Sequence, residues 1–531
     1  MIDLAPAHLA TLGRLLAAHT PECEVRAFGS RVTWTAKNHS DLDLALVGPE
    51  KLAPSRLRRL REAFEESNLP MRVDLLDWHA ISESFQKVIA ERFEVIQQPA
   101  KVSAGRTEWE ILHLGDLGRV VTGKTPLTAV EENFGGQIPF VTPSDMDGRK
   151  SISTTARNLT ETGAASVKGS KIPAGSVMVS CIGSDMGKAV IAGRDCVTNQ
   201  QINSIVVDDR FSSEFVYYNL STRKEEIRHQ AAGGSAQPIL NKGDFSRLEI
   251  TLPLLAEQKA IAAVLGALDD KIELNRRMNA TLEAMARALF QNWFVDFDPV
   301  RAKLDGRPPA ALDPATAALF PEHLEDAPLG HIPKGWTAGK LGDIGTNSRR
   351  GVQPGDIAPN TPYIALEHMP RRCIALGDWE DSADVAGGKS AFKKGEILFG
   401  KLRPYFHKVG VAPFDGVCST DILVLAPKSP EWFGFLLGHA SSDELIQFTD
   451  LASTGTKMPR TNWSDISSFK VALPPKPIAA AFTRNIQPML DRIHANLHES
   501  RTLATLRDTL LPKLLSGELS VAKTVLSPVN E

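Results

Sequence analysis

The sequence lacks the cysteine pairs and long apolar runs that mark several protein classes. Its five cysteines are scattered and form no C-x-x-C pair, so they predict neither a disulfide framework nor a zinc site and fit a reducing compartment. No apolar run approaches the ~18–20 residues that span a bilayer. The N-terminal stretch MIDLAPAHLATL also has no basic segment of the kind that begins a signal peptide. We therefore expect a cytoplasmic protein without a membrane segment.

Catalytic motifs are absent from most of the chain. Residues 108–518 contain no GxxxxGK[ST] phosphate loop, no NPPY-type methyltransferase motif and no convincing cluster of nuclease carboxylates. The net charge is −3, whereas a protein that binds nucleic acid alone is usually basic. Local basic patches, or positive charge from partner subunits, can offset this. We expect this region to bind rather than to catalyse, and to need no cofactor.

The main feature that is present is an internal repeat. Residues 231–258 recur as residues 451–479 at an offset of 221, which places Gly234 on Gly455. Upstream, residues 114–126, 138–146 and 173–192 resemble residues 341–354, 361–369 and 393–412 with small length changes. Each copy combines short β-rich segments, broken by Gly and Pro, with one long helix. Because one core rarely exceeds ~250–300 residues, the chain should form several domains. A duplication without functional meaning stays open.

A coiled-coil seam runs along both long helices, expected over residues 255–294 and 475–518. Seam residues recur in alternating steps of four and three for more than four heptads, which is typical of a coiled coil. They are Ile261, Leu265, Leu268, Ile272, Asn275, Asn279, Leu282, Ala286 and Leu289, then Phe482, Ile486, Met489, Ile493, Asn496, Ser500, Leu503, Arg507 and Leu510. The open alternative is an amphipathic helix buried in its own domain.

An asparagine stands at the same place in both seams, at Asn275 and Asn496. A polar seam residue costs stability but fixes register, so an antiparallel pair should bring the two asparagines together near its midpoint. Between the copies, residues 295–333 are rich in proline and acidic residues. We predict an extended linker there.

With this architecture the chain resembles the specificity subunit of type I restriction–modification systems, over about residues 108–518. The most specific pieces are GGSAQPILNKGDFSRLEITLPLLAEQ (233–258), ALFQNWFVDFDP (288–299) and LRDTLLPKLLSGEL (506–519). The second copy departs from the family at PPKPIA (474–479), where PPLxEQ is usual.

This resemblance implies an α+β multidomain fold. It has two β-rich target-recognition domains, residues 108–254 and 334–474, each followed by a long helix, and the helices pair as an antiparallel coiled coil. Each domain would read one half of a split site in double-stranded DNA. The family subunit docks methyltransferase (modification) subunits, which methylate adenine using S-adenosylmethionine, and restriction subunits, which translocate and cut DNA.

Residues that contact DNA should be basic or amide side chains in the glycine-rich loops, because phosphate and base contacts need such groups. The candidates are Lys124, Lys188 and Gln200 in the first copy, and Arg349, Arg350, Lys401, Arg403, Lys457 and Arg460 in the second. The best single patch is KLRPYFHK (401–408), where basic and aromatic residues alternate. For each of these residues a solvated surface charge is the alternative.

Residues 1–100 lie outside the repeat and carry a pattern of carboxylates. VRAFGS (25–30) predicts a strand ending in a Gly-Ser turn, and SDLDLALVG (40–48) predicts the next strand, on which Asp41 and Asp43 share one face. Asp74 lies in a third strand. Three converging carboxylates can hold Mg²⁺ ions that bridge a nucleoside triphosphate. Gly29 and Ser30 would let backbone N–H groups approach the phosphates.

This N-terminal region resembles the minimal nucleotidyltransferases of the polymerase-β superfamily, which are small α/β domains. The resemblance implies that Asp41 and Asp43 bind metal and that Asp74 completes the site and could act as a base. The sequence departs from the family at GSRVTW, where GSRARG is common. A retained fold without activity, serving as a docking module, therefore stays open.

Three functions are compatible with these patterns. The extent of the repeat favours a DNA-specificity subunit with an accessory nucleotidyltransferase-like domain. The second is an enzyme that transfers a nucleotide to RNA or protein and uses the repeats as its targeting platform. The third is a structural adaptor that makes no DNA contact.

Overall fold

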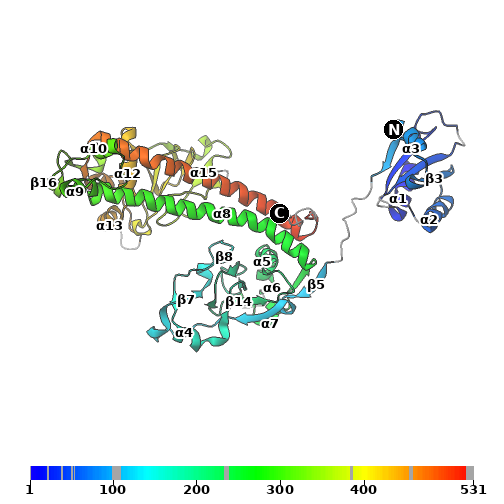
Figure 1. The fold of residues 1–531 in the computed structure, drawn as a ribbon, viewed down its shortest axis with the longest axis horizontal. Coiled ribbons are helices and arrows are strands. Elements are labelled where there is room, and N and C mark those ends of the chain that lie inside the picture. Colours follow the sequence, from blue (N-terminus) through cyan, green and yellow to red (C-terminus); the bar gives the residue numbers. More distant parts are fainter. Residues whose placement is uncertain are drawn as a thin grey trace. The chain divides into compact units, whose positions relative to one another are not determined.

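The computed structural model describes residues 2–20, 23–37, 40–48, 52, 54–98, 109–231, 238–382, 387–453 and 458–521 (Figure 1). The chain divides into two compact units. Unit 1 comprises residues 1–111 with residues 251–254, and unit 2 comprises residues 112–250 and 255–531. Within the described ranges, no helix is both long and apolar enough to cross a membrane.

Unit 1 contains a four-stranded sheet covered by helices. Its elements are α1 (Pro6–His19), β1 (Glu24–Phe28), β2 (Leu42–Val47), α2 (Pro54–Glu65), β3 (Val73–Asp77), α3 (Glu83–Glu91) and β4 (Glu94–Gln97). The strand order is β3-β2-β1-β4, with β2 and β3 parallel and the other neighbours antiparallel. Alternate strand residues such as Val25 and Leu44 pack on Leu16 of α1 and Phe64 of α2. Unit 1 is thus the small α/β domain that the sequence predicts.

Unit 2 begins with the first copy of the repeat, here called repeat domain 1 (residues 112–250). Its main elements are β6 (Gly118–Thr122), β7 (Phe134–Val141), β8 (Ser151–Ile152), β9 (Asn158–Leu159), α4 (Glu161–Ser166), β10 (Lys171–Ile172), β11 (Val177–Ser180), β12 (Ala189–Ala192), β13 (Cys196–Thr198), β14 (Ile202–Val207), α5 (Ser213–Ser221), α6 (Lys224–Gln230) and α7 (Lys242–Ser246). Strands β5 (Glu110–His113) and β15 (Glu249–Leu252) flank it. One sheet has the order β6-β14-β11-β12-β8 and the other β10-β13-β7-β9.

Repeat domain 2 (residues 334–474) repeats this plan. Its main elements are β18 (Thr337–Lys340), α11 (Leu341–Ile344), β19 (Gly345–Asn347), β20 (Gly351–Val352), β21 (Pro362–Ile364), β22 (Glu380–Asp381), β23 (Lys389–Phe392), β24 (Ile397–Gly400), β25 (Val409–Val411), β26 (Gly416–Cys418), β27 (Ile422–Pro427), α12 (Phe433–Ala440), α13 (Asp443–Ala452), α14 (Trp463–Ser468) and β28 (Lys470–Leu473). The order β19-β27-β24-β25 matches β6-β14-β11-β12 of repeat domain 1. The second sheets, too, share a parallel pair, β7 with β13 and β21 with β26.

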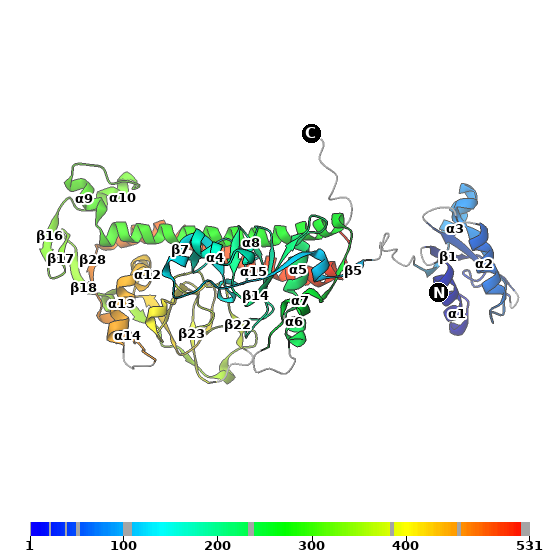
Figure 2. The same ribbon diagram turned by 90° about the horizontal axis from the view of Figure 1, so that it is seen from below.

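Two long helices, α8 (Leu255–Phe290) and α15 (Lys476–Leu515), pair along their length, as Figure 1 shows; in the view of Figure 2, α8 covers much of α15. Side-chain contacts join Asp269 to Arg507 and Asn279 to Asn496, so residue numbers fall along α15 as they rise along α8. The pair is therefore antiparallel. Every seam position predicted above is buried or half-buried, which confirms the coiled coil. At the PPKPIA departure α15 still forms, because a proline in the first turn gives up no helical hydrogen bond.

The predicted extended linker over residues 295–333 is wrong. The segment folds into α9 (Asp298–Leu304), α10 (Pro314–Leu319) and the hairpin β16 (Leu324–Ala327) with β17 (Gly330–Pro333). Val300, Phe320 and Ile332 anchor it in the core that holds Trp293, which lies in the π-helical turn after α8. These apolar anchors bury enough surface to outweigh the proline-rich composition.

Candidate nucleic-acid interface and nucleotide site

A basic groove opens on repeat domain 2. It encloses about 650 Å³ and is lined by Arg349, Lys389, Lys401 and Arg460 together with polar residues such as Asn347, Gln353 and Asn462. None of its lining residues is acidic. Three of the side chains predicted to contact DNA thus meet in one concave surface, although they come from segments more than 50 residues apart in places. A concave cationic surface of this kind suits a polyanion.

The groove is built where three segments meet at the end of β24. The Lys401 amide donates to the Asp421 carbonyl at 2.9 Å, and the Thr461 amide donates to the Lys401 carbonyl at 3.0 Å. An isolated bridge between Leu402 and Arg460 fixes the third segment. Arg460 is 3.4 Å from Asp421 but stays more than half exposed, so its guanidinium can still reach a ligand.

Three other predicted residues of repeat domain 2 lie elsewhere. Arg350 pairs with Glu396, a mostly buried carboxylate, and its Nε donates to the Ala391 carbonyl at 3.3 Å. This side chain therefore ties strands together and does not line the groove. Arg403 lies beside the groove, directly after Leu402, in a left-handed backbone conformation with φ of 50°. Lys457 falls outside the described residues.

In repeat domain 1, Lys124 and Gln200 lie on neighbouring segments. The Lys124 amide donates to the Thr198 carbonyl at 2.9 Å, and the Thr125 hydroxyl donates to Gln200 Oε1 at 2.6 Å. Both predicted side chains are exposed. Lys188 is not with them: it pairs with Asp185 at 2.9 Å and lines a hollow of about 530 Å³ against α8 and α15.

Two cations of the groove in repeat domain 2, Lys401 and Arg460, have no basic counterpart in repeat domain 1. The Leu402–Arg460 bridge corresponds to a bridge between Ile182 and Ile239, so Lys401 corresponds to Cys181 and Arg460 to Ile239. Cys181 is buried, and burial raises the pKa of its thiol to about 12. The two copies therefore present different chemistry at the same place. Sequence reasoning missed this, although the repeat offset contains the correspondence.

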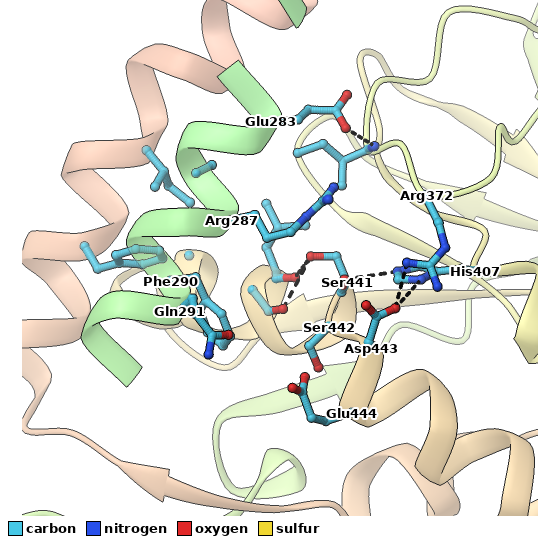
Figure 3. A pocket seen from close by; sticks show the side chains of 17 residues that line it. Glu283, Arg287, Phe290, Gln291, Arg372, His407, Ser441, Ser442, Asp443 and Glu444 are labelled. Atoms are coloured by element: carbon cyan, nitrogen blue, oxygen red, sulfur yellow. Dashed lines mark hydrogen bonds and ion pairs between the residues drawn. The ribbon is translucent and has the colours of Figure 1, made fainter. Parts of the chain in front are cut away.

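A small pocket of about 120 Å³ marks the junction of α8 with repeat domain 2 (Figure 3). At its edge Glu283 accepts hydrogen bonds from the Ile374 and Ala375 amides at 3.0 and 3.2 Å. On the opposite side the ring of His407 bonds the Ser441 carbonyl at 3.0 Å and faces Asp443 at 3.4 Å. Both acidic and basic side chains line this pocket.

The two seam asparagines lie side by side. Asn496 Nδ2 donates to Asn279 Oδ1 at 2.8 Å, and Asn275 Nδ2 donates to Ser500 Oγ at 3.3 Å. Asn275 corresponds to Asn496 and Asn279 to Ser500 at the offset of 221, so these contacts are related by an approximate twofold axis. Asn275 and Asn496 are both buried. Their predicted role in register stays a prediction.

In unit 1, two of the predicted carboxylates are direct neighbours across parallel strands. Asp43 of β2 is the register partner of Asp74 of β3. Burial raises the pKa of Asp43, and the carboxylates of Asp74 and Asp41 raise it further. This concentration of negative charge fits a cation-binding role. The carboxylates are not preassembled, however: in the described residues no group of three or more His, Cys, Asp or Glu side chains is arranged to hold a metal.

The predicted Gly-Ser turn faces this carboxylate pair. Gly29 has φ of 78°, and a β-carbon at this position would stand 2.5 Å from Asp43 Oδ2. Only glycine therefore fits beside Asp43 without a shift of the carboxylate. Ser30 follows in the same turn, and the Thr33 and Thr35 amides bond to the Gly29 and Ser30 carbonyls at 3.2 and 3.0 Å. Arg72 pairs with Asp74 at 3.1 Å while remaining largely exposed.

Comparison with known proteins agrees with both resemblances. Residues 106–284 match the family described as "Type I restriction modification DNA specificity domain", and residues 20–100 match "Polymerase beta, Nucleotidyltransferase". The specificity subunit of the type I restriction enzyme MjaIX of Methanocaldococcus jannaschii is 29% identical over 78% of this chain and 94% of its own length. The HindI specificity subunit of Haemophilus influenzae is 24% identical over 78% of this chain and its whole length.

Unit 1 has a separate relative. The probable protein adenylyltransferase MntA of Haemophilus influenzae is 46% identical over 100 residues, which is 19% of this chain and 88% of that protein. Among solved structures, the S subunit of a type I restriction–modification system from M. genitalium covers 77% of this chain and 97% of its own, with 16% identity and a TM-score of 0.45. The sequence matches confirm both predicted resemblances.

Proposed function

Because the chain combines a type I restriction–modification DNA specificity domain with a nucleotidyltransferase domain, we propose that unit 2 is the DNA-reading subunit of such a system. Each repeat domain binds one half of a bipartite site in double-stranded DNA. The matches along the repeats do not favour an enzyme that merely uses them as a targeting platform. Methyltransferase and restriction subunits dock on the chain and supply the chemistry.

The basic groove of repeat domain 2 is the observation that carries this proposal. Arg349, Lys401 and Arg460 give it a cationic lining free of acidic residues, as phosphate contacts require. The net charge of −3 does not oppose this, because the cations are concentrated on one concave surface.

The spacer supports the bipartite arrangement. At ~1.5 Å per residue, the 36 residues of α8 extend over ~54 Å. One turn of DNA measures ~34–36 Å, so half-sites about one turn apart lie within reach of domains held along this helix.

The test uses the chain assembled with its methyltransferase subunits. Mapping of methylated bases in DNA exposed to this complex should return a bipartite site. The triple variant Arg349→Ala, Lys401→Ala, Arg460→Ala should bind that site more weakly and with a shallower salt dependence, because each lost phosphate contact lowers the slope by ~1. Arg307→Ala, an exposed arginine of the segment between the copies, is the control. Binding that does not respond to salt would contradict the proposal.

A second candidate function belongs to unit 1. We propose that it transfers a nucleotide from a nucleoside triphosphate with Mg²⁺. The pairing of Asp43 with Asp74, and the close approach of Gly29 to Asp43, support a site of this type. Asp41, Asp43 and Asp74 would hold the metal, which neutralises phosphate charge when bound. Gly29 and Ser30 would lie next to the phosphates.

Incubation of the purified chain with ATP labelled on the α-phosphate tests this activity. Label should pass to the chain itself or to a co-purifying protein or RNA, and Asp43→Asn should abolish the transfer. Glu65→Gln, on the exposed face of α2, removes one carboxylate outside the site and should leave the transfer intact. If the unaltered chain transfers no label, unit 1 is a docking module without this activity.

A further inference from the structure

Repeat domain 1 has a loop between β11 and β12, and repeat domain 2 has the corresponding loop between β24 and β25. The two loops have the same backbone hydrogen bond at their base. In domain 1 the Ser180 amide bonds the Lys188 carbonyl at 2.9 Å, and in domain 2 the Gly400 amide bonds the Lys408 carbonyl at 2.8 Å. The strand register agrees, since Val177 pairs with Ile191 as Ile397 pairs with Val411. Residues 181–188 therefore correspond one by one to residues 401–408.

The two loops differ at their left-handed positions. In domain 1 these positions are Gly183 and Gly187, with φ of 87° and 86°. In domain 2 the corresponding residues are Arg403 and His407, both with φ of 50°. A residue with a β-carbon pays a conformational penalty there that glycine avoids. Because the same backbone forms with glycine in domain 1, domain 2 keeps two side chains at a cost.

The contacts of the His407 side chain explain why this left-handed position carries a histidine rather than a glycine. It is buried, its Nε2 bonds the Ser441 carbonyl at 3.0 Å, and its Nδ1 faces Asp443 at 3.4 Å (Figure 3). The ring fastens the loop to the turn between α12 and α13. His407 is a positioning residue of the fold.

No comparable contact accounts for Arg403. Its Nε is buried without a hydrogen-bond partner, and no ion pair joins its guanidinium to any residue in the described part of the chain. The guanidinium lies 5.8 Å from the ring centre of Phe406, whereas Arg371 stacks on that ring at 4.0 Å. Folding therefore gains little from this arginine.

The position of Arg403 indicates a role in binding a ligand rather than in folding. Its neighbour Leu402 bridges Arg460, and Lys401 and Arg460 both line the basic groove. Tyr405, two residues further along the chain, has an exposed ring. Arg403 therefore lies at the edge of a cationic surface, and its guanidinium has hydrogen-bond donors that no described residue accepts.

We propose that Arg403 is the specificity-determining residue of repeat domain 2 and donates to the edge of a guanine in the second half-site. The inference rests on the proposed DNA-reading function. Arginine that donates twice to guanine O6 and N7 is the commonest specific contact in DNA recognition. Domain 1 has glycine at this position, so it must read its half-site through other residues, such as Gln200.

Arg403→Gly tests the proposal, because it installs the residue that domain 1 uses on the same backbone. In the complex with methyltransferase subunits, the melting temperature should stay unchanged or rise. Discrimination at one guanine of the second half-site should fall about 5- to 150-fold, the range for one bidentate contact. Discrimination in the first half-site should not change. Arg307→Ala serves again as the matched control.

The possible outcomes separate the two proposals. If the unaltered complex reads a bipartite site and Arg403→Gly still discriminates at every position, only the role of Arg403 is overturned. A lower melting temperature with a uniform loss of affinity would also overturn it, because that pattern belongs to a structural arginine. If the unaltered complex binds no DNA, both proposals fail.

Discussion

Replacing Glu283 with alanine should loosen repeat domain 2 from the spacer. Glu283 lies in α8 and is 6% exposed. Its carboxylate accepts the Ile374 and Ala375 amides at 3.0 and 3.2 Å and the Cys373 thiol at 3.2 Å. Burial and the adjacent Glu283 raise the pKa of this thiol to about 12, so it stays protonated and donates. Alanine removes the acceptor for all three groups.

The size of the effect follows from these contacts. A hydrogen bond to a charged group contributes ~1.5–3 kcal/mol, so two amide bonds contribute ~3–6 kcal/mol. Water that enters the vacated space recovers part of this, which leaves about 3 kcal/mol. Since 1.4 kcal/mol corresponds to a factor of ten, the Ile374 and Ala375 amides should exchange with solvent deuterium roughly 100-fold faster.

Hydrogen exchange followed by mass spectrometry on peptides covering residues 370–378 measures this directly. Glu273→Ala is the matched control, because Glu273 lies on the same helix and pairs only with Arg276 and Arg277 among the described residues. It removes the same charge without touching the domain. Exchange of the Ile374 and Ala375 amides within threefold of the unaltered chain would refute the anchoring role of Glu283.

Three further substitutions test the packing of unit 2. Gly438→Ala should cost about 1–3 kcal/mol, seen as a lower melting temperature, because its β-carbon would stand 2.0 Å from Phe290 Cδ2. Asn496→Ala should cost about 1–3 kcal/mol in urea unfolding, because it leaves the buried Asn279 Oδ1 without its 2.8 Å donor. Burial lowers the pKa of His439 to about 3, so its ring stays neutral in the fold but takes up a proton near pH 6.5 when unfolded. Stability should therefore fall by about 1–2 kcal/mol from pH 7 to pH 5, and His439→Phe should remove that part of the pH dependence.

The repeat made much of unit 2 predictable. An ungapped offset of 221 residues through both helices implies matching helix starts, at Leu255 and Lys476, and one seam. The buried contacts of α8 with α15 follow from it. The pairing of Asp43 with Asp74 follows equally directly from the sequence, since each lies in an apolar strand and the two strands are neighbours. Asp41 lies just before β2, so its place on the same face stays a prediction. In both cases the prediction depends on a regular spacing of residues within a short stretch of sequence.

The segment between the copies was mispredicted for the opposite reason. Its fold depends on apolar anchors such as Val300, Phe320 and Ile332, which are separated by 12 to 20 residues and follow no period. The lining of the groove could not be predicted from the sequence for a similar reason. The neighbouring sequence does not reveal that Arg349 lines the groove whereas Arg350 does not. The acidic partner of Arg350 is Glu396, which is 46 residues away in the sequence.

The coiled coil departs from its own symmetry at the points where it holds the repeat domains. Asp269 and Glu283 are buried carboxylates of α8, and their counterparts in α15 are Leu490 and Ala504. Asp269 accepts the Tyr218 hydroxyl of repeat domain 1 and the Arg507 guanidinium, both at 2.7 Å.

Each repeat domain is thus fastened by a buried carboxylate of the same helix. The two anchors are 14 residues apart, which is ~21 Å along the axis at ~1.5 Å per residue. An approximate twofold axis explains how the duplicated helices pair, but it does not set this distance. The separation of these two anchors is set by the length of α8 between Asp269 and Glu283.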